Sequence, residues 1–136
     1  MSEIDYIQWQ SEFLTGIDKI DEGHHHFIKT HNKLVDIINK DFCEKKLLEI
    51  LYAVMHYAEH HLINEELCYQ GYDGFSEHKA KHKEFVGKIN DVRETMEKNN
   101  NSDVCIKLQN YMHDWFMQHI IKKDMEAVKY VKNNPR

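Results

Sequence analysis

The sequence predicts an all-α protein, an antiparallel up-down four-helix bundle preceded by an N-terminal arm. Apolar residues recur at steps of three and four in four long stretches, as on the buried face of a helix. Turns rich in glycine and asparagine separate the later stretches, and the only proline, Pro135, leaves the chain free to form long helices. The 136 residues, 41% of them apolar, suit one domain with one core.

The first sixteen residues lack clear helical periodicity. They contain Trp9, Phe13 and Leu14 and end at Gly16. We therefore expect residues 1–16 to form an arm that packs on the bundle. The bundle itself should span residues 17–131, with a short tail at 132–136.

The first two helices are expected at 17–40 and 44–70. The inward positions of the first are Ile17, Ile20, His24, Phe27, Ile28, His31, Leu34, Val35 and Ile38. Those of the second are Leu47, Leu51, Val54, Ala58, His61, Glu65 and Cys68, spaced four, three, four, three, four and three. Such regular steps are typical of a buried helical stripe.

A turn at 71–74 precedes the third helix, expected at 75–98, and a turn at 99–102 precedes the fourth, which runs to about 131. The third carries Phe75, His78, His82, Phe85, Ile89, Val92 and Met96 inward. The fourth carries Leu108, Met112, Trp115, Phe116, His119, Ile120, Asp124, Ala127, Val128 and Val131. Ser102 or Asp103 is the expected N-cap of this last helix. Four such helices joined by short links favour antiparallel neighbours.

Composition excludes several classes of function. A net charge of −5 argues against nucleic acid or an acidic membrane as the partner. The sequence has neither the apolar run of a membrane span nor a signal peptide, so a cytoplasmic location is expected. The odd number of widely spaced cysteines, Cys43, Cys68 and Cys105, predicts free thiols in a reducing compartment rather than disulfides.

Seven ionisable residues interrupt the inward faces of the four predicted helices. They are His24, His61, Glu65, His78, His82, His119 and Asp124. A lone histidine on an apolar face is usually an ordinary core residue. Burying seven such groups without partners would cost several kcal/mol each, and a shared metal site removes that cost because each group becomes a ligand.

The spacing of these residues supports a shared site. His61 and Glu65 are four residues apart, as are His78 and His82, so each pair projects from one helix face. His119 and Asp124 are five apart, about 140° on an ideal α-helix. That pair needs side chains that reach from either side of the face, or a local distortion of the helix.

The remaining histidines provide a control for the assignment of inward-facing and outward-facing helix positions. His25, His26, His56, His60 and His113 lie off the inward faces and should be exposed to solvent. His56 and His60 share the four-residue spacing, so only helical phase separates that pair from His61 and Glu65. His31 is in phase with His24 and is expected to be a core or edge histidine, with a place beside the ligand pocket as the alternative.

The types and number of these residues also limit which metal ion the site can bind. Five imidazoles and two carboxylates exceed a tetrahedral zinc site, and calcium and magnesium prefer oxygen ligands. Imidazole with carboxylate suits iron or a similar transition metal, and seven groups suggest two metals. If both carboxylates and one solvent oxygen bridge the pair, a three-to-two division of histidines leaves one metal with an open position. An open position is what binding a small diatomic ligand requires.

The ordered motifs resemble those of the hemerythrins, especially the short bacterial ones. They are His24, then His61-Leu-Ile-Asn-Glu65, then His78-Lys-Ala-Lys-His82, then His119-Ile-Ile-Lys-Lys-Asp124. The similarity runs from about Trp9 to Val131, and all seven ligand positions are filled in order.

The resemblance implies a role for each residue. His78, His82 and His119 would bind one iron ion, and His24 and His61 the other, which carries the vacancy. Glu65 and Asp124 would bridge the two irons together with an oxo or hydroxo bridge. O2 would bind reversibly at the open iron, for carriage, storage or delivery, in a dry pocket lined by Trp115, Phe116 and Ile120. The protein is then a binding protein and not an enzyme, without catalytic residues.

Three residues depart from the family pattern: Gly23, His31 and Phe116. Gly23 is expected to loosen the start of the first helix, and the other two to alter the polarity and size of the pocket, with packing as the main role of Phe116. An alternative function is a di-iron enzyme reactive toward oxygen, nitric oxide or peroxide, or a sensor coupled to a partner. A structural metal site, perhaps zinc, is a third reading. Without a signalling region on the chain, a covalently linked sensor output is disfavoured.

Overall fold

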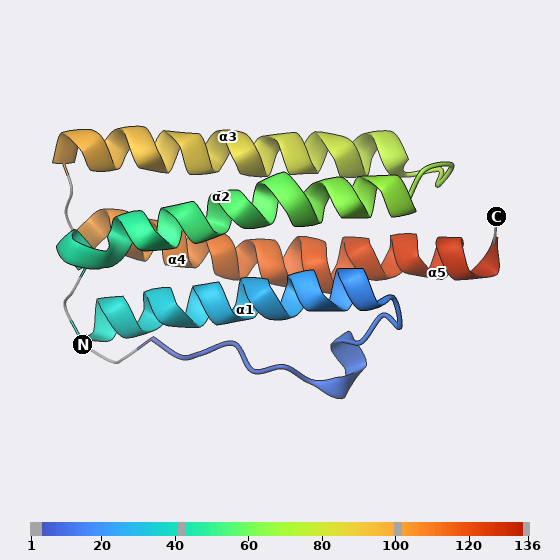
Figure 1. Cartoon of the computed structure of the whole chain (residues 1–136), viewed down its shortest axis with the longest axis horizontal. Coiled ribbons are helices and arrows are strands. Elements are labelled where there is room, and N and C mark those ends of the chain that lie inside the picture. Colours follow the sequence, from blue (N-terminus) through green and yellow to red (C-terminus); the bar gives the residue numbers. More distant parts are fainter. Residues whose placement is uncertain (1–3, 41–42, 100–101, 135–136) are drawn as a thin grey trace.

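The computed structural model describes residues 4–40, 43–99 and 102–134. Three helices, α1 (Asp18–Asn39), α2 (Cys43–Cys68) and α3 (Phe75–Asn99), pack beside a fourth rod that consists of α4 (Ser102–Trp115), η2 (Phe116–Asp124) and α5 (Met125–Asn133). Successive rods run in opposite directions (Figure 1). The predicted antiparallel four-helix bundle is confirmed, and the expected helix ends agree with the observed ends to within two residues.

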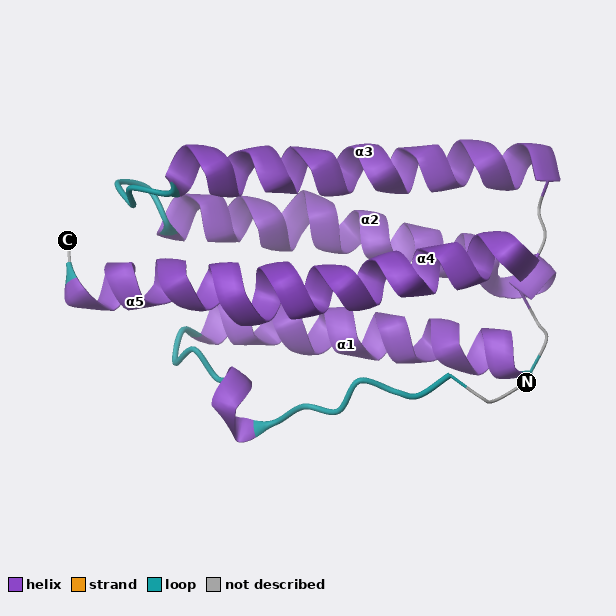
Figure 2. Ribbon diagram, turned by 180° about the vertical axis from the view of Figure 1, so that it is seen from behind, coloured by secondary structure: helices purple, strands orange, loops and turns teal. Residues whose placement is uncertain are grey.

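The fourth rod changes its helical geometry halfway along. Its middle segment, η2, is a π-helix of nine residues between two α-helical segments. Figure 2 shows α4 and α5 as parts of one continuous rod, so the change of geometry does not break the chain direction. Hydrogen bonds in a π-helix span five residues instead of four, which widens the turn.

The N-terminal segment lies along α1 (Figure 1) and includes a short 3-10 turn, η1 (Ser11–Phe13). The side-chain amide of Asn32 in α1 accepts a hydrogen bond from the backbone N–H of Ile7 and donates one to its carbonyl, both at 2.8 Å. At the start of α1 the Asp21 carboxylate accepts bonds from the backbone N–H groups of Thr15 (2.9 Å) and Gly16 (3.1 Å). These bonds hold the arm at both of its ends.

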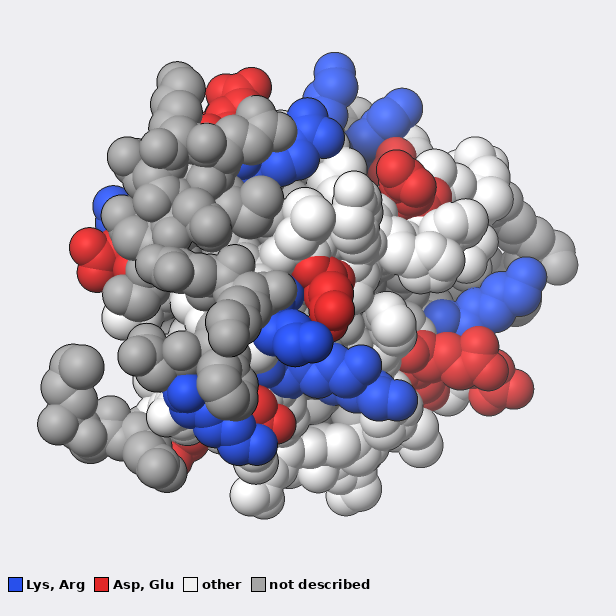
Figure 3. Space-filling view, turned by 60° about the vertical axis from the view of Figure 1, so that its left-hand side comes forward, with Lys and Arg blue, Asp and Glu red and all other residues white. Residues whose placement is uncertain are grey.

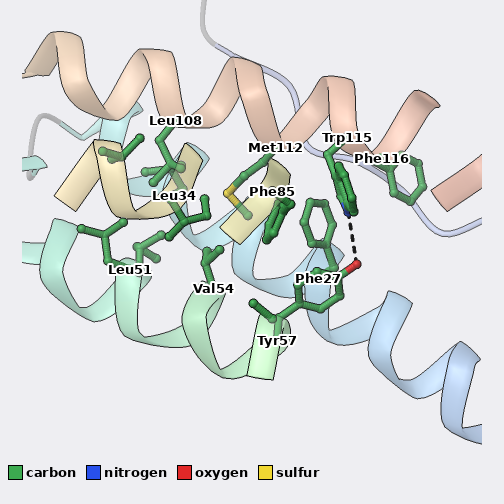
Figure 4. Close-up of a cluster of buried hydrophobic side chains, with 14 of the residues drawn as sticks. Phe27, Leu34, Leu51, Val54, Tyr57, Phe85, Leu108, Met112, Trp115 and Phe116 are labelled. Carbon is green, nitrogen blue, oxygen red and sulfur yellow. Dashed lines mark hydrogen bonds between the residues drawn. The ribbon is translucent and has the colours of Figure 1, made fainter. Parts of the chain in front are cut away.

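The main core fills one half of the bundle with large side chains from all four rods. Figure 4 shows Phe27, Leu34, Leu51, Val54, Tyr57, Phe85, Leu108, Met112, Trp115 and Phe116 packed together, and all are buried. Each large apolar side chain contributes about 1.5–3 kcal/mol when fully buried. The indole N–H of Trp115 donates a hydrogen bond to the Tyr57 hydroxyl at 3.2 Å, so the buried indole N–H has a partner inside the core.

The prediction of free thiols is wrong for two of the three cysteines. Cys43, the first residue of α2, forms a disulfide with Cys105 in the first turn of α4, with a Cα–Cα distance of 6.2 Å. The two helices begin at the same end of the antiparallel bundle, which brings together residues separated by 62 positions. Cys68 is a free, half-buried cysteine, as expected.

The predicted turn after α2 is confirmed. Gly71 has φ of 88°, and the N–H of Tyr72 bonds to the carbonyl of Tyr69 at 3.0 Å. Asn100 and Asn101 of the second predicted turn lie outside the described residues, as do the side chains of Met96 and Ser102. The predicted N-cap of the last helix is wrong, because α4 begins at Ser102 and both Ser102 and Asp103 are already helical residues.

The surface carries charges of both signs. On the face in Figure 3, basic side chains are interspersed with acidic ones instead of forming one continuous basic patch. Among the described residues, no helix has the length and apolar character needed to cross a membrane.

Candidate metal centre

The seven inward-facing ionisable residues meet at one place in the bundle, and each of the four rods contributes. His24 comes from α1, His61 and Glu65 from α2, His78 and His82 from α3, and His119 and Asp124 from η2. None of the seven is more than 5% exposed. The inward-facing positions that helical periodicity identified on four separate helices therefore form one buried cluster.

One oxygen of each carboxylate faces the histidines of α1 and α2. Glu65 Oε2 lies 3.2 Å from His24 Nε2 and 3.4 Å from His61 Nε2. Asp124 Oδ2 lies 3.0 Å from the same His24 nitrogen.

The other oxygen of each carboxylate faces the remaining three histidines. Glu65 Oε1 lies 3.3 Å from His82 Nε2. Asp124 Oδ1 lies 2.9 Å from His78 Nε2 and 3.4 Å from His119 Nε2. The carboxylates thus stand between a pair and a trio of histidines, with one oxygen toward each.

The π-helical geometry of η2 explains how Asp124 joins His119. On an α-helix these residues would point about 140° apart. In the wider turn of a π-helix, a residue comes close to stacking over the fifth residue before it, so both side chains reach the same side. The local distortion that the spacing required is present.

Several potential metal-ligand atoms of the cluster have no hydrogen-bond partner of suitable geometry. These buried atoms are His61 Nε2, His78 Nε2, His119 Nδ1, Glu65 Oε1 and Asp124 Oδ1. His82 Nε2 and His119 Nε2 also approach to 3.0 Å, although in neutral imidazoles only one of the two can donate. Buried polar atoms are normally satisfied, and four of these five are the atoms that would face a metal ion.

The donor set therefore fits a pair of transition-metal ions. Two groups of residues have ligand atoms close enough to hold an ion: Glu65, His78, His82, His119 and Asp124 in one, and His24, His61 and Glu65 in the other. Imidazole and carboxylate together are typical ligands of iron, and no thiolate takes part.

The electrostatics of the centre keep its carboxylates ionised. Burial opposes the charged form of Glu65, but nearby His61 and the hydrogen bond to His24 hold the pKa of Glu65 well below its usual range. Burial and the charge of Glu65 oppose ionisation of Asp124, yet His119 keeps the pKa of Asp124 below its ordinary value.

The histidine shifts follow from the same balance. Burial disfavours a charged His24, but Asp124 and Glu65 outweigh it and raise the pKa of His24 to about 10. Burial wins at His119 and lowers its pKa, whereas Glu65 and Glu66 outweigh burial at His82 and raise its pKa. The two carboxylates thus favour the charged form of His24 and His82, whereas burial favours the neutral form of His119.

Two residues, Glu66 and Tyr69, contact ligands of the centre and help to orient them. The sequence analysis did not assign either residue to the centre. Glu66 lies 3.1 Å from the second ring nitrogen of His82, where a carboxylate fixes the tautomer and ring orientation. Tyr69, fully buried, donates a hydrogen bond to Glu65 Oε2 at 3.5 Å. Their position one and four residues after Glu65 was the signal that could have identified them.

Gly23 has a steric role that its departure from the family pattern did not predict. A Cβ atom at this position would lie 1.7 Å from Nδ1 of His61 and 2.1 Å from Cε1. Helix α1 runs through Gly23 without interruption, and the expected loosening of its start stays a prediction. The missing side chain gives the His61 imidazole its space.

The three residues predicted to line the pocket are all buried, and Trp115 contacts the centre directly. Trp115 stacks on His119 with ring centroids 4.0 Å apart and planes inclined by 15°. Phe116 packs against Phe27 and against Phe13 of the arm, with centroids 6.5 and 5.3 Å away, which agrees with a mainly packing role. Ile120 belongs to the same apolar cluster.

Tyr57 also lies against the centre, and the sequence reasoning did not identify it. Its ring stacks on His61 with centroids 5.0 Å apart, and its hydroxyl accepts the Trp115 hydrogen bond. Burial, with the charges of Glu65 and Asp124, raises the pKa of Tyr57 well above its usual range, so the phenol stays protonated. Its position four residues before His61 was the available signal.

The remaining histidines lie where helical phase placed them. His25, His26, His56, His60 and His113 are exposed, which confirms that expectation. His31 is fully buried and confirmed as a core histidine. Its Nδ1 lies 2.9 Å from the side-chain oxygen of Asn32 and its Nε2 lies 3.1 Å from Gln109 Nε2.

Comparisons with known proteins point to one family. Residues 15–131 match the family model described as the hemerythrin HHE cation binding domain. The chain is 30% identical to a bacteriohemerythrin of Clostridium acetobutylicum over 126 residues, which are 88% of this chain and 97% of the relative. It is 29% identical to a bacteriohemerythrin of Methylococcus capsulatus, over 84% of this chain and 87% of that one. A Pseudomonas aeruginosa bacteriohemerythrin is 24% identical over 95% of this chain and 84% of its own length.

Proposed function

We propose that this chain, which belongs to the hemerythrin family, binds O2 reversibly at a pair of non-haem iron ions and serves in oxygen carriage, storage or delivery. The observation that carries the proposal is the division of the buried cluster. Each carboxylate presents one oxygen to a pair of histidines and the other oxygen to a trio. An unequal division leaves one ion of a bridged pair with an open position.

The proposed roles follow that division. His24 and His61 would hold the iron with the open position, and His78, His82 and His119 would hold the other. Glu65 and Asp124 would bridge the two ions, in addition to an oxo or hydroxo bridge. When bound, the iron pair supplies the electrons and the vacant position that O2 needs; the protein is then a binder of O2 and not an enzyme.

The surrounding residues keep the site dry, which a reversible oxygen binder requires. Trp115, Phe116 and Ile120 would form the wall of the O2 pocket, and all three are buried. Phe27 adds a ring 5.0 Å from that of Tyr57 and so extends the apolar wall. Tyr57 remains protonated, and because its oxygen accepts the bond from Trp115, its own O–H stays available to donate.

The first test is the iron content together with the optical spectrum of anaerobically reduced protein. The spectrum is then recorded after O2 is added and again after it is removed. Two irons per chain and a reversible charge-transfer band would support the proposal. Two irons that oxidise without a lasting adduct would favour an oxygen-reactive enzyme or a sensor. A single tightly bound zinc ion would mean that the chain shares the four-helix bundle of the family but not its oxygen-binding function.

Substitutions test the assignment of ligands. Glu65→Ala and Asp124→Ala should each abolish the spectrum of a coupled iron pair. His60→Ala, which changes an exposed neighbour of His61, should leave the final iron content unchanged. A coupled iron pair that survives in Asp124→Ala would remove the bridging assignment.

The expected cytoplasmic location remains a prediction. The Cys43–Cys105 disulfide weighs against it, because disulfides persist mainly in oxidising compartments. Fractionation of the source cells, with the thiol content of the freshly isolated protein, would decide the matter.

A further inference from the structure

Four side chains outside the buried centre face one surface pocket between α1 and α2. Glu22 and His26 come from α1, and His56 and His60 come from α2. All four are exposed, and the pocket has a volume of about 310 Å³. None of them is needed by the centre described above.

The spacing of these residues gathers them on facing sides of two adjacent helices. Glu22 and His26 are four residues apart, as are His56 and His60, so each pair projects from one face of its helix. The ring centroids of His56 and His60 lie 4.3 Å apart, and those of His56 and His26 lie 6.1 Å apart. The ligand atoms of these residues do not yet converge in the structure, so a bound ion would require the exposed imidazoles to change rotamer and turn their ring nitrogens toward one point.

We propose that Glu22, His26, His56 and His60 form a second metal site, which takes one divalent transition-metal ion such as Zn²⁺ or Fe²⁺. Three imidazoles and one carboxylate make up a four-coordinate ligand set of the kind such ions prefer. Calcium and magnesium are disfavoured because they require mostly oxygen ligands. The two i, i+4 pairs supply ligands from both helices, so a bound ion cross-links α1 to α2.

The position of this surface site gives it a role in iron uptake, an extension that rests on the proposed di-iron function. His61, a proposed ligand of the buried centre, lines the same pocket. Gly23 also lines it and carries no side chain that could cover the His61 ring. An ion held by the surface histidines is therefore separated from the buried ligands by the imidazole of His61, whose ring lies 5.0 Å from that of His24.

Zinc stoichiometry tests the site itself. Metal-free protein is dialysed against Zn²⁺, and bound zinc per chain is compared among wild type, His56→Ala/His60→Ala, His26→Ala and the control His113→Ala, an exposed histidine away from this pocket. Loss of a mere hydrogen-bond partner of a ligand weakens metal binding roughly 10- to 100-fold, so loss of a ligand should do at least as much. The double variant and His26→Ala should each bind one zinc fewer than wild type and control. Equal stoichiometry in all four proteins would overturn the proposal.

The rate of iron loading tests the uptake role. Under anaerobic conditions, Fe²⁺ should fill the buried pair of the double variant at least several-fold more slowly than that of His113→Ala. Both proteins should reach the same final occupancy of the buried pair, measured by the charge-transfer band that O2 produces in samples withdrawn at intervals. Equal loading rates would overturn the uptake role. If wild type and control both fail to take up two irons, the proposed di-iron function fails, and the zinc comparison still decides the surface site.

Discussion

Replacing Gly23 by alanine should cancel or reverse the stabilisation that a glycine-to-alanine change usually gives in a helix. Alanine is favoured over glycine by about 0.8–1 kcal/mol in a helix interior. At Gly23, however, the new Cβ would lie 1.7 Å from His61 Nδ1, whereas ordinary contacts begin at 3.4 Å. The ring must therefore retreat by roughly 2 Å, and such overpacking costs about 1–3 kcal/mol. Gly23→Ala should be neutral, or destabilised by up to about 2 kcal/mol.

Gly87 in α3 provides the matched control, because a Cβ there meets no atom within 4 Å. Gly87→Ala should gain about 1 kcal/mol. Urea unfolding of the metal-free proteins measures both changes. A displacement of roughly 2 Å also exceeds the few tenths of an ångström that metal ligands tolerate. The iron content of Gly23→Ala should thus fall from two per chain toward one, while Gly87→Ala keeps two. If Gly23→Ala becomes as stable as Gly87→Ala and retains both irons, the steric argument is wrong.

Four further predictions concern the core. The Cys43–Cys105 disulfide closes a loop of 62 residues. Its reduction should lower the free energy of unfolding of the metal-free protein by about 2–4 kcal/mol. A urea midpoint that does not change in reductant would contradict the cross-link. Gln109→Leu should cost about 1–3 kcal/mol because it leaves the buried His31 Nε2 unpaired, and His31→Leu added to it should recover most of that loss in the same assay. Burial and nearby His113 lower the pKa of His31, so its contribution to stability is present above the unfolded pKa of about 6.5 and is lost as pH falls toward the folded pKa. Urea unfolding at pH 5 and pH 7 should show a smaller acid loss in His31→Leu, and equal losses would count against this assignment. Tyr57→Phe removes the acceptor of the Trp115 N–H, so we expect about 1–3 kcal/mol of destabilisation and a shorter lifetime of the O2-bound spectrum, whereas an unchanged lifetime would exclude Tyr57 from the pocket.

Local periodicity was enough to predict most of the fold and the membership of the buried cluster. Helical phase is set by neighbours three and four residues away, so it placed His61 inward and His60 outward without knowledge of the other helices. The same reasoning separated exposed His113 from buried His119. Ordered motifs on four segments made a shared metal centre the simplest explanation.

Other features depended on contacts between segments far apart in the chain, and only the tertiary structure decided them. The disulfide exists because antiparallel packing starts α2 and α4 at one end of the bundle, which wide cysteine spacing did not reveal. Gly23 matters through a ring on another helix, so its role has no local signature. The five-residue spacing of His119 and Asp124 required a distortion, but the choice of a π-helix and the division of carboxylate oxygens between two sets of histidines are properties of the assembled bundle. Periodicity reports which face of a helix is buried; which atoms meet across that face is determined by packing.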